Sequence, residues 1–387
     1  MMGDVTESLP HGPYVVLGGP PFEPSANQTS LQMFDAIGTQ HPVLYVCRRY
    51  QGSIIRRIFK GALGRTSTKL GPGLSRLDSN RFLLVLPRIV DLLPLIHPEA
   101  SRRLVSQVIQ CSVRRTISRL RWERPVLVSY WWMFPELVSM KIWRRRVFDV
   151  IDRHWGYAYE PNSKVRQRNF DLAAETARVS DKVVCVSEGL VTELSGNVAP
   201  QLLPNAIDLE RVKRSAVNGP GVRSNTAVYA GGWNERLDHE LLAELVRRNP
   251  EWQFAFVGAD PDERFSHFSN VKFFGDVPYD TVLRELSQAR IGLIPFVSNS
   301  FTESSNFLKI LDYLASGVTI GATDLASLRE WNERYPDTFK ILENLEEWDE
   351  LFSCAGDADL RTSDLLEGGD MIRYGTMTRA LSLVSTA

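Results

Sequence analysis

Cysteine is scarce in this chain of 387 residues: only Cys47, Cys111, Cys185 and Cys354 occur, and no two of them form a C-x-x-C pair. The six histidines also lack the spacing of metal ligands. These absences argue against a disulfide framework and a structural zinc site. The chain has no uninterrupted apolar run of about 18 residues, and its first residues lack the basic and apolar segments of a secretion signal. We therefore expect a protein of the reducing cytoplasm without a metal site.

Two nucleotide-binding signatures are missing as well. Neither G-x-G-x-x-G after a first strand nor G-x-x-x-x-G-K-S/T occurs in the sequence. A dinucleotide-dependent dehydrogenase and a P-loop ATPase are therefore disfavoured. The composition is that of a globular protein, with 43% hydrophobic and 24% charged residues. At about 150 residues per domain, the length predicts two domains.

Strand and helix patterns alternate along the chain, which is typical of parallel α/β sheets. In the first half, residues 81–98 are interpreted as a strand and a loop, or as an apolar segment lying at a membrane interface. Residues 61–73 are rich in glycine and predict a loop. The strands of this half are expected at residues 14–18, 43–47, 126–129, 147–151 and 182–186, and its helices at 31–37, 102–120 and 170–179.

A second run of alternating elements begins at residue 227, after a linker predicted at 216–225. It includes a helix expected at residues 306–316. The domain boundaries predicted from this order are 1–204 and 205–365. Residues 366–387 are expected to form a terminal helix that packs back on the first domain.

Charge is divided unevenly between the parts of the chain. Residues 41–147 hold 21 Lys and Arg against 5 Asp and Glu, whereas the rest of the chain holds 24 against 41. Such a split indicates that one part faces a polyanion. Nucleic acid, an anionic membrane face and a lipid phosphate all fit this charge, as does a basic surface that only faces water.

A Gly-Gly turn follows the first strand of each half, Gly18-Gly19 and Gly231-Gly232, where a ligand can approach the strand ends. Lys309 and Asp312 are three residues apart and share one helix face. A polar loop that includes Asn299 and Thr302 enters this helix, and backbone N–H groups at such a place suit an anion. An ordinary ion pair between Lys309 and Asp312 is the alternative interpretation.

Several segments together resemble the GT-B glycosyltransferases, in particular the family-4-like enzymes of bacterial cell-surface polysaccharide synthesis, of the teichuronic-acid type. These segments are LLPNAIDLERV, AVYAGGWNERLD, WQFAFVGA, NVKFFGDVPYDTV and RIGLIPFVSNSFTESSNFLKILDYLASG. The resemblance is strongest from about residue 183 to residue 325. It implies an α/β fold of two tandem Rossmann-like, doubly wound domains with a cleft between them. The first domain would bind the acceptor and the second the nucleotide sugar.

The resemblance also implies roles for single residues of the second domain. Arg236 and Lys309 are expected at the donor diphosphate, beside Gly231 and Gly232, and Asp312 at the ribose. Residues 275–279, with Val277, are expected to frame the base. Asn299, Thr302 and Glu303 complete the expected donor site.

The sequence departs from the family pattern at three of these positions. The acid at Asp312 is usually Glu, Glu303 lies nine residues before it instead of eight, and Phe307 stands where proline is common. These departures concern the sugar contact of Glu303 and the identity of the donor sugar. Asp260-Pro-Asp262 looks like the metal-binding D-x-D of another transferase fold, and we interpret it as a surface turn.

On the acceptor side, residues 149–155 end a strand in acid, Arg, His and Trp. Similar polysaccharide transferases, including the xanthan glucuronosyltransferase, place a catalytic aspartate there, so Asp152 is the expected general base and His154 its neighbour. Arg153 is expected to keep Asp152 ionised or to bind the acceptor. The alternative for Asp152 is a helix N-cap. Further acceptor-side candidates are Gly18, Gly19, Trp131 and Trp132, the two tryptophans being equally compatible with a core position.

The expected function is transfer of a sugar from a nucleotide diphosphate sugar, with UDP as the expected nucleotide, without a metal cofactor. The expected acceptor is a glycan or a polyprenyl-diphosphate-linked intermediate, and no nucleic acid partner is expected. The basic segment would hold the enzyme at the anionic inner face of the plasma membrane. Two alternatives remain: a nucleotide-sugar 2-epimerase of the same fold, and a non-catalytic nucleotide-sugar-binding protein.

Overall fold

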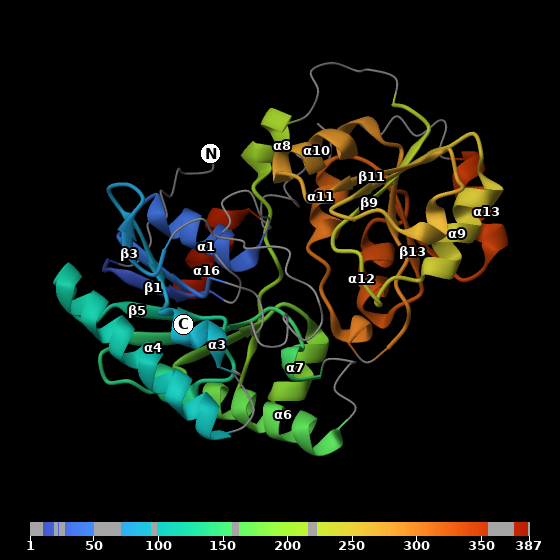
Figure 1. The fold of residues 1–387 in the computed structure, drawn as a ribbon. Helices are drawn as coiled ribbons and strands as arrows, with labels where there is room; N and C mark the ends of the chain where they lie inside the picture. The colour runs from blue at the N-terminus through green and yellow to red at the C-terminus, as the bar shows by residue number, and fades with distance from the viewer. Residues whose placement is uncertain are drawn as a thin grey trace, which may run out of the picture. The chain divides into compact units, whose positions relative to one another are not determined.

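The chain folds into two compact units, seen here in a computed structural model (Figure 1). The N-terminal unit comprises Met1–Asn205 and Thr376–Ala387, and the C-terminal unit comprises Ala206–Gly375. Each unit holds one sheet, so the predicted α/β class with two sheet domains is confirmed. The structure describes residues 11–18, 22, 28–49, 71–93, 99–156, 162–215, 223–299, 301–354 and 375–385.

The N-terminal unit is built on an eight-stranded sheet whose neighbouring strands run parallel, except for the antiparallel pair β3 and β4 at one edge. Parallel strands end at one common edge, where side chains from successive loops meet. In sheet order the strands are β3 (Gly73–Arg76), β4 (Arg81–Val85), β2 (Val43–Cys47), β1 (Tyr14–Leu17), β5 (Val126–Ser129), β6 (Arg145–Val150), β7 (Lys182–Cys185) and β8 (Gln201–Leu202).

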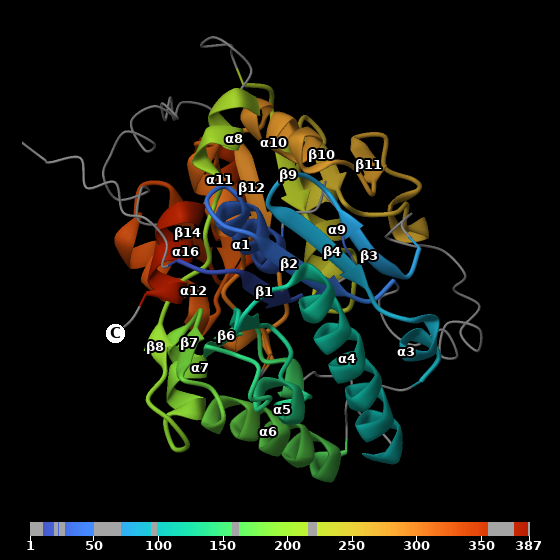
Figure 2. The ribbon, with the colours of Figure 1, turned by 90° about the vertical axis from the view of Figure 1, so that its left-hand side faces the viewer.

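Helices cover both faces of this sheet (Figures 1 and 2). Phe148 and Val150 of β6 pack in one apolar cluster with side chains of α6 and α7, whereas the intervening Asp149 meets Arg379 of α16. This alternation is that of a strand buried on both faces. The helices are α1 (Thr29–Gly38), α3 (Arg88–Leu92), α4 (Glu99–Leu120), α5 (Pro135–Val138), η1 (His154–Gly156), α6 (Ser163–Arg178), α7 (Glu188–Leu194) and α16 (Thr376–Val384).

A buried ion pair joins the C-terminal helix to the middle of the N-terminal sheet. Arg379 of α16 donates two hydrogen bonds to Asp149 of β6, at 2.7 and 2.8 Å, and both side chains are almost fully buried. Its Nε also donates to the carbonyl of Pro204. The terminal helix thus belongs to the N-terminal unit although about 170 residues of the other unit precede it.

The segment at residues 81–98 differs from the strand and loop that its sequence indicated. The segment begins with β4, which is followed by the short helix α3 instead of a loop. The strand β3, which precedes β4 in the sequence, pairs with it in an antiparallel direction. Pro87 precedes α3 and fixes a backbone angle suited to a helix start. Residues 61–70, within the predicted glycine-rich loop, and 94–98 lie outside the described residues.

The C-terminal unit is built on a six-stranded sheet in which all neighbouring strands are parallel. In sheet order these are β11 (Val271–Gly275), β10 (Gln253–Val257), β9 (Thr226–Ala230), β12 (Ile291–Ile294), β13 (Thr319–Thr323) and β14 (Phe339–Leu342). The helical elements are α8 (Leu209–Ser215), α9 (His239–Arg248), η2 (Glu263–Phe265), α10 (Tyr279–Gln288), η3 (Thr302–Ser304), α11 (Lys309–Ala315), α12 (Ala326–Arg334) and α13 (Leu345–Cys354).

Two glycines in this sheet allow helices to lie close on opposite faces. A Cβ at Gly292 of β12 would stand 2.5 Å from the ring of Tyr313 in α11. A Cβ at Gly321 of β13 would stand 2.6 Å from Leu351 in α13. Because Gly321 pairs with Leu293, the residue after Gly292, the two glycines face opposite sides of the sheet. The unit is therefore doubly wound, as predicted.

Candidate functional site

A glycine turn at the end of β9 forms the floor of the candidate site in the C-terminal unit. Gly231 has a φ of +142°, a backbone conformation that side chains rarely adopt. A Cβ on Gly231 would lie 2.9 Å from Nζ of Lys309. The hydroxyl of Tyr229 fixes the turn by donating to the carbonyl of Gly232 at 2.9 Å. Glycine is therefore required here for the approach of the Lys309 ammonium.

Lys309 is the first residue of α11, and aromatic rings surround its ammonium. Its Nζ lies 3.9 Å from the ring centroid of Tyr229 and 4.7 Å from that of Phe296. Among the described residues no carboxylate pairs with Lys309, so the alternative of an ion pair with Asp312 is not realised. Burial, and then repulsion by Arg236, hold the pKa of Lys309 well below its ordinary value.

Arg236 supplies a second cation to the same place. Its Nε donates to Oδ1 of Asn234 at 3.1 Å, and its guanidinium lies 5.3 Å from the ring centroid of Phe301. Within the described part of the chain, Arg236 forms no salt bridge. Two cations that repel each other and face rings instead of carboxylates form a site of positive potential. Such a site suits a ligand with two or more negative charges, such as a diphosphate.

Asp312 lies one helical turn from Lys309, but its carboxylate faces another direction. Its Oδ1 accepts a 2.5 Å hydrogen bond from the hydroxyl of Tyr279, the first residue of α10. Arg211 stacks over the Tyr279 ring, with 4.9 Å between the guanidinium carbon and the ring centroid. Burial, and then the Asp312 charge, raise the pKa of Tyr279 well above its ordinary value. Tyr279 therefore acts as a hydrogen-bond donor that orients Asp312.

The polar loop before α11 uses its side chains to hold its own backbone. Asn299 Oδ1 accepts from the N–H groups of Phe301 and Thr302, and the buried Thr302 hydroxyl donates to the carbonyl of Val297. Glu303 accepts from the Ser298 hydroxyl with one oxygen and from the N–H of Ala326 with the other. In this structure these three expected donor residues therefore shape the loop, and Glu303 holds the beginning of α12.

The remaining expected donor residue and the D-x-D sequence lie around β11. Val277 is half-buried in the loop between β11 and α10, which follows Gly275 with its φ of +65°. Asp262 accepts from the Trp233 indole at 2.7 Å and pairs with Arg264. No group of three potential metal ligands occurs among the described residues. Asp262 thus caps η2, because its carboxylate accepts from the N–H of Arg264.

In the N-terminal unit, Asp152 and His154 follow the carboxyl end of β6 and are both partly exposed. Asp152 Oδ1 accepts from the N–H of Arg153, and its carbonyl accepts from that of His154. The segment that follows Asp152 begins with η1, whose first residue is His154, and the later helix α6 is capped by Asn162. Both predicted catalytic residues thus lie at the sheet edge where the strand order places them.

Arg153 has a different partner from the one that the sequence suggested. Its guanidinium forms two 2.8 Å hydrogen bonds with Glu193 of α7, which also accepts from the Trp155 indole. The Glu193 carboxylate raises the pKa of Arg153. Its charge is therefore balanced by Glu193, and Arg153 anchors the segment that carries Asp152.

The aromatic and glycine candidates of the N-terminal unit serve packing. Trp131 and Trp132 are each only 4% exposed and belong to two apolar clusters of the core, so their burial favours the core alternative. A Cβ at Gly18 would stand 2.0 Å from the ring of Tyr45, so glycine is required there for this contact. Gly19 lies outside the described residues.

Sequence reasoning missed the aromatic lining of the cation site. Tyr229 stands two residues before the glycine turn, and Phe296 and Phe301 flank the polar loop. In the sequence these aromatic residues look like ordinary core residues. Only their short distances to Lys309 and Arg236 in the structure show that they belong to the site. Tyr279 lay within the expected base-binding loop but had no role assigned to it.

Comparison with known proteins gives one related sequence and many related folds. No protein-family profile matches the chain. It is 22% identical over 223 residues to the "Putative teichuronic acid biosynthesis glycosyltransferase TuaH" of Bacillus subtilis. The match covers 52% of this chain and 56% of that protein, so it spans little more than half of this curated relative.

Solved structures resemble the chain over nearly its whole length. Sucrose-phosphate synthase of Thermosynechococcus elongatus has a TM-score of 0.68 at 12% identity, covering 96% of this chain and 97% of that one. HepE of Anabaena in complex with UDP-glucose has a TM-score of 0.60 at 12% identity, covering 96% and 98%. Trehalose-6-phosphate synthase of E. coli bound with UDP-2-fluoro glucose has a TM-score of 0.63 at 9% identity, covering 97% and 99%. The chain therefore has the GT-B fold that its sequence resemblance predicted.

Proposed function

We propose that this protein is a glycosyltransferase that takes its sugar from a UDP-sugar. The observation that carries the proposal is the pair of neighbouring cations, Lys309 and Arg236, which form no salt bridge with any carboxylate of the described residues. A diphosphate supplies the missing negative charge, and charge-assisted hydrogen bonds to phosphate are among the strongest in proteins. Solved proteins of the same fold were observed with UDP-glucose and UDP-2-fluoro glucose, which supports this donor class.

Each part of the donor has a proposed partner in the C-terminal unit. Lys309 and Arg236 neutralise the diphosphate above the Gly231-Gly232 turn, so the reaction needs no metal for this purpose. Asp312, held by Tyr279, accepts hydrogen bonds from the ribose, and the loop with Val277 frames the base. Glu303 acts as a positioning residue, because both of its oxygens already hold the loop and α12.

Asp152 is the proposed general base of the N-terminal unit. An acceptor hydroxyl is a weak nucleophile until a positioned group takes its proton. Asp152 is partly exposed at the carboxyl edge of the sheet, and the Arg153–Glu193 pair fixes the next residue. His154 lies within the same turn and is its proposed neighbour in proton transfer.

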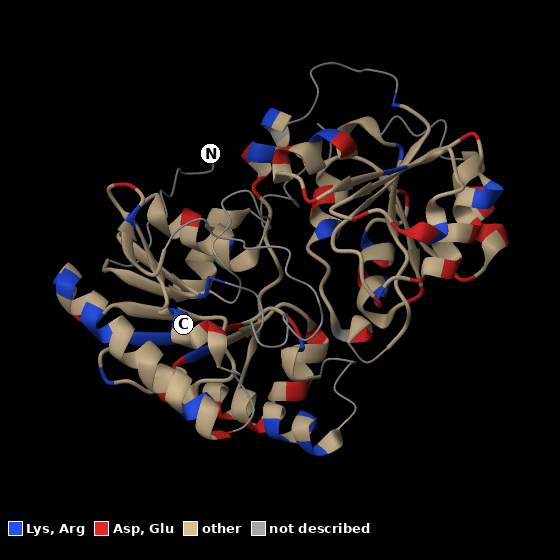
Figure 3. Cartoon of the chain, viewed as in Figure 1, with Lys and Arg blue, Asp and Glu red and all other residues tan. Residues whose placement is uncertain are grey.

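The proposed acceptor is a glycan or a polyprenyl-diphosphate-linked intermediate of cell-surface polysaccharide synthesis. The enzyme works at the inner face of the plasma membrane in this proposal. Ile89 and Leu92 of α3 and Leu104 of the adjacent α4 are 46–47% exposed, and Figure 3 shows basic residues along α4. Exposed apolar side chains beside basic ones are typical of a surface that binds anionic lipid. No helix of the described residues is long and apolar enough to cross a bilayer.

A turnover assay with Asp152→Asn tests the activity. We expect sugar release from a UDP-sugar, accelerated by acceptor, and a loss of about 10²–10⁴-fold in the variant, because asparagine cannot take the proton. UDP affinity should stay unchanged. The matched control is Asp171→Asn on the exposed face of α6, which should keep its turnover. Release of an epimerised donor, or no turnover at all with any UDP-sugar, would contradict the proposal.

Vesicle flotation tests the membrane part separately. The double variant Ile89→Ser/Leu92→Ser should bind phosphatidylglycerol-containing vesicles less than the unchanged protein does. Leu202→Ser is the control, because Leu202 is 41% exposed on β8 and does not belong to α3 or α4. Equal flotation of all three proteins would remove α3 from the proposed membrane surface.

A further inference from the structure

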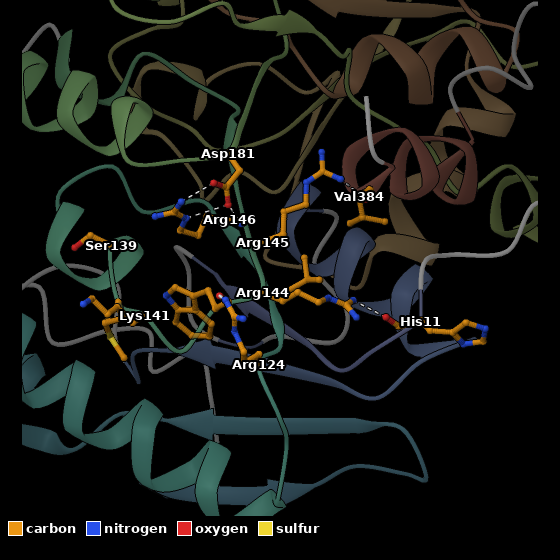
Figure 4. A pocket seen from close by; sticks show the side chains of 12 residues that line it. His11, Arg124, Ser139, Lys141, Arg144, Arg145, Arg146, Asp181 and Val384 are labelled. Carbon is orange, nitrogen blue, oxygen red and sulfur yellow. Dashed lines mark hydrogen bonds and ion pairs between the residues drawn. The ribbon is translucent and has the colours of Figure 1, made fainter.

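A large basic cavity lies in the N-terminal unit, away from the residues discussed above. It has a volume of about 790 Å³, within the range of small-molecule sites. Figure 4 shows the side chains around it, most of which come from the beginnings of β5 and β6 and from the loops before them. The others are His11 before β1, Asp181 before β7 and Val384 of α16. Its charged lining residues are Arg124, Lys141, Arg144, Arg145, Arg146 and Asp181.

The cavity stands at the opposite edge of the sheet from the proposed base. Arg145 and Arg146 begin β6, whereas Asp152 follows its last residue. A strand of six residues spans about 20 Å. A ligand in this cavity would therefore lie away from Asp152, which is not among the lining residues.

Only part of the positive charge around the cavity is balanced. Arg146 forms two hydrogen bonds with Asp181, the one carboxylate among the described lining residues. Arg144 donates to the carbonyl of His11, and Arg145 to that of Val384 at 3.3 Å. These carbonyls orient the guanidinium groups, as Figure 4 shows, but carry no net charge.

Two more cations add to the excess of positive charge around the cavity. Arg124 donates to the carbonyl of Trp143 at 3.3 Å, and Lys141 is exposed at the rim of the cavity. Four cations of the lining thus lack a carboxylate among the described residues. Charges of one sign that converge on a concave, partly apolar surface raise the local concentration of the opposite ion.

The backbone around the cavity adopts conformations that cost free energy. Arg124 has a φ of +41°, which is uncommon for a residue with a side chain. Gly12, with a φ of +141°, leaves the space that the Arg144 guanidinium occupies, since a Cβ there would lie 2.6 Å from it. Strained backbone tends to occur where a site holds a ligand, because the rest of the fold must compensate for it.

We propose that this cavity binds a phosphate monoester or a diphosphate group, as a second anion site distinct from the donor site. The guanidinium groups of Arg124 and Arg144 and the ammonium of Lys141 bind the phosphate oxygens. The group belongs either to a small soluble molecule or to the headgroup of a lipid. Both sources present the same phosphate oxygens and negative charge to the cavity. The vesicle experiment below distinguishes them.

Calorimetry with pyrophosphate tests the site on the full chain. Lys309→Ala is used as the background, so that the proposed donor site does not dominate the binding. In this background Arg124→Gln/Lys141→Gln should weaken pyrophosphate binding about a hundredfold, or about tenfold for each charge-assisted contact. Lys164→Gln/Lys340→Gln is the matched control, because it removes two exposed lysines, of α6 and β14, that line neither the cavity nor the proposed membrane surface, and should change the affinity less than twofold.

Vesicles distinguish the two sources of phosphate. If the ligand is a lipid headgroup, flotation with vesicles of phosphatidylcholine and phosphatidylglycerol should decrease in the cavity variant and not in the control. If it is a soluble phosphate, only the pyrophosphate titration responds. Lys141→Glu alone serves as a second variant that should fold normally, since Lys141 is exposed. It should weaken pyrophosphate binding, as the double variant does.

The proposal is overturned if the cavity variants and the control bind pyrophosphate and anionic vesicles equally well. It is also overturned if Lys309→Ala by itself removes all pyrophosphate binding and the cavity variants do not alter flotation. Failure of the proposed donor site gives a different result, in which Lys309→Ala leaves UDP binding intact while the cavity variants still lose pyrophosphate.

Discussion

Charged side chains inside the two units have different kinds of partner. In the N-terminal unit, Arg379 meets Asp149, and both are shielded from water. In the C-terminal unit, Lys309 and Arg236 meet aromatic rings and repel each other. A buried charge with a good partner is part of the scaffold, because the pair is satisfied before any ligand arrives. A half-buried charge that has no carboxylate partner among the described residues keeps its capacity to attract an anion, and the unpaired charge destabilises the fold until that anion binds.

The pKa shifts of Arg379 and Lys309 also differ between the two units. Burial alone would lower the pKa of Arg379, but the Asp149 carboxylate holds it above the ordinary value. For Lys309 burial and Arg236 act together, and Asp312 opposes them only in part. Relative to the ordinary pKa values, the folded state therefore favours the charged form of Arg379 and disfavours the charged form of Lys309.

Breaking the satisfied pair should have the largest effect on stability. Arg379→Met leaves the buried Asp149 carboxylate without its partner, which costs about 3–5 kcal/mol. Urea unfolding followed by hydrogen exchange of the N-terminal sheet should show this loss. Asp149→Leu/Arg379→Met should recover much of it, because both charges are then gone. A loss below about 1 kcal/mol in the single variant would show that water already reaches the pair.

A change at Glu303 should have an intermediate effect on stability. This partly exposed acid accepts a hydrogen bond at the start of α12. Glu303→Ala should cost about 1 kcal/mol, because the N–H of Ala326 loses its acceptor at the start of α12. Glu303→Gln should keep most of the stability, since its amide oxygen can still accept. If Glu303→Ala unfolds as the unchanged protein does but turnover is lost, Glu303 contacts the donor sugar after all.

The unsatisfied site predicts a small effect of the opposite sign. Lys309→Met should leave the ligand-free C-terminal unit as stable as before or slightly more stable, because it removes an ammonium that burial disfavours. Thermal unfolding without UDP measures this. Lys340→Met, an exposed control in β14, should make no difference. A marked loss of stability in Lys309→Met would mean that the ring contacts hold the scaffold together.

The stability difference between Lys309→Met and the unchanged protein should also depend on pH. Because the pKa of Lys309 is lower in the folded than in the unfolded state, the folded state binds fewer protons between that lowered value and the ordinary value near 10.5. The cost of Lys309 is therefore fully present below the lowered pKa and disappears as pH rises toward 10.5. Unfolding midpoints over this range should converge for the two proteins. Parallel midpoints would contradict the assigned direction.

Local patterns allowed the prediction of much of the fold, because each strand of a parallel sheet is a short apolar run followed by a helix. The helix α11 begins at Lys309, three residues later than predicted. The pairing of β3 with β4 was missed, since Gly73–Arg76 is short and largely exposed and has no apolar run.

Contacts between residues that are distant in the sequence limited how much of the site could be predicted. Asp149 and Arg379 are 230 residues apart, and Glu303 and Ala326 are 23 apart, so no spacing rule connects them. The sequence placed Lys309 and Arg236 together only through its family resemblance. Asp312, the acid one turn from Lys309, accepts from the Tyr279 hydroxyl, a contact 33 residues away in the sequence that no local pattern predicts.

Titration calorimetry of UDP against the unchanged protein, Lys309→Ala, Arg236→Ala and the exposed control Lys340→Ala tests the central claim most directly. Each charge-assisted phosphate contact contributes about 1.5–3 kcal/mol, so the first two variants should bind UDP at least about tenfold more weakly. The control should bind UDP as the unchanged protein does. Equal UDP affinity in all four proteins would contradict the assignment of the donor diphosphate to Lys309 and Arg236.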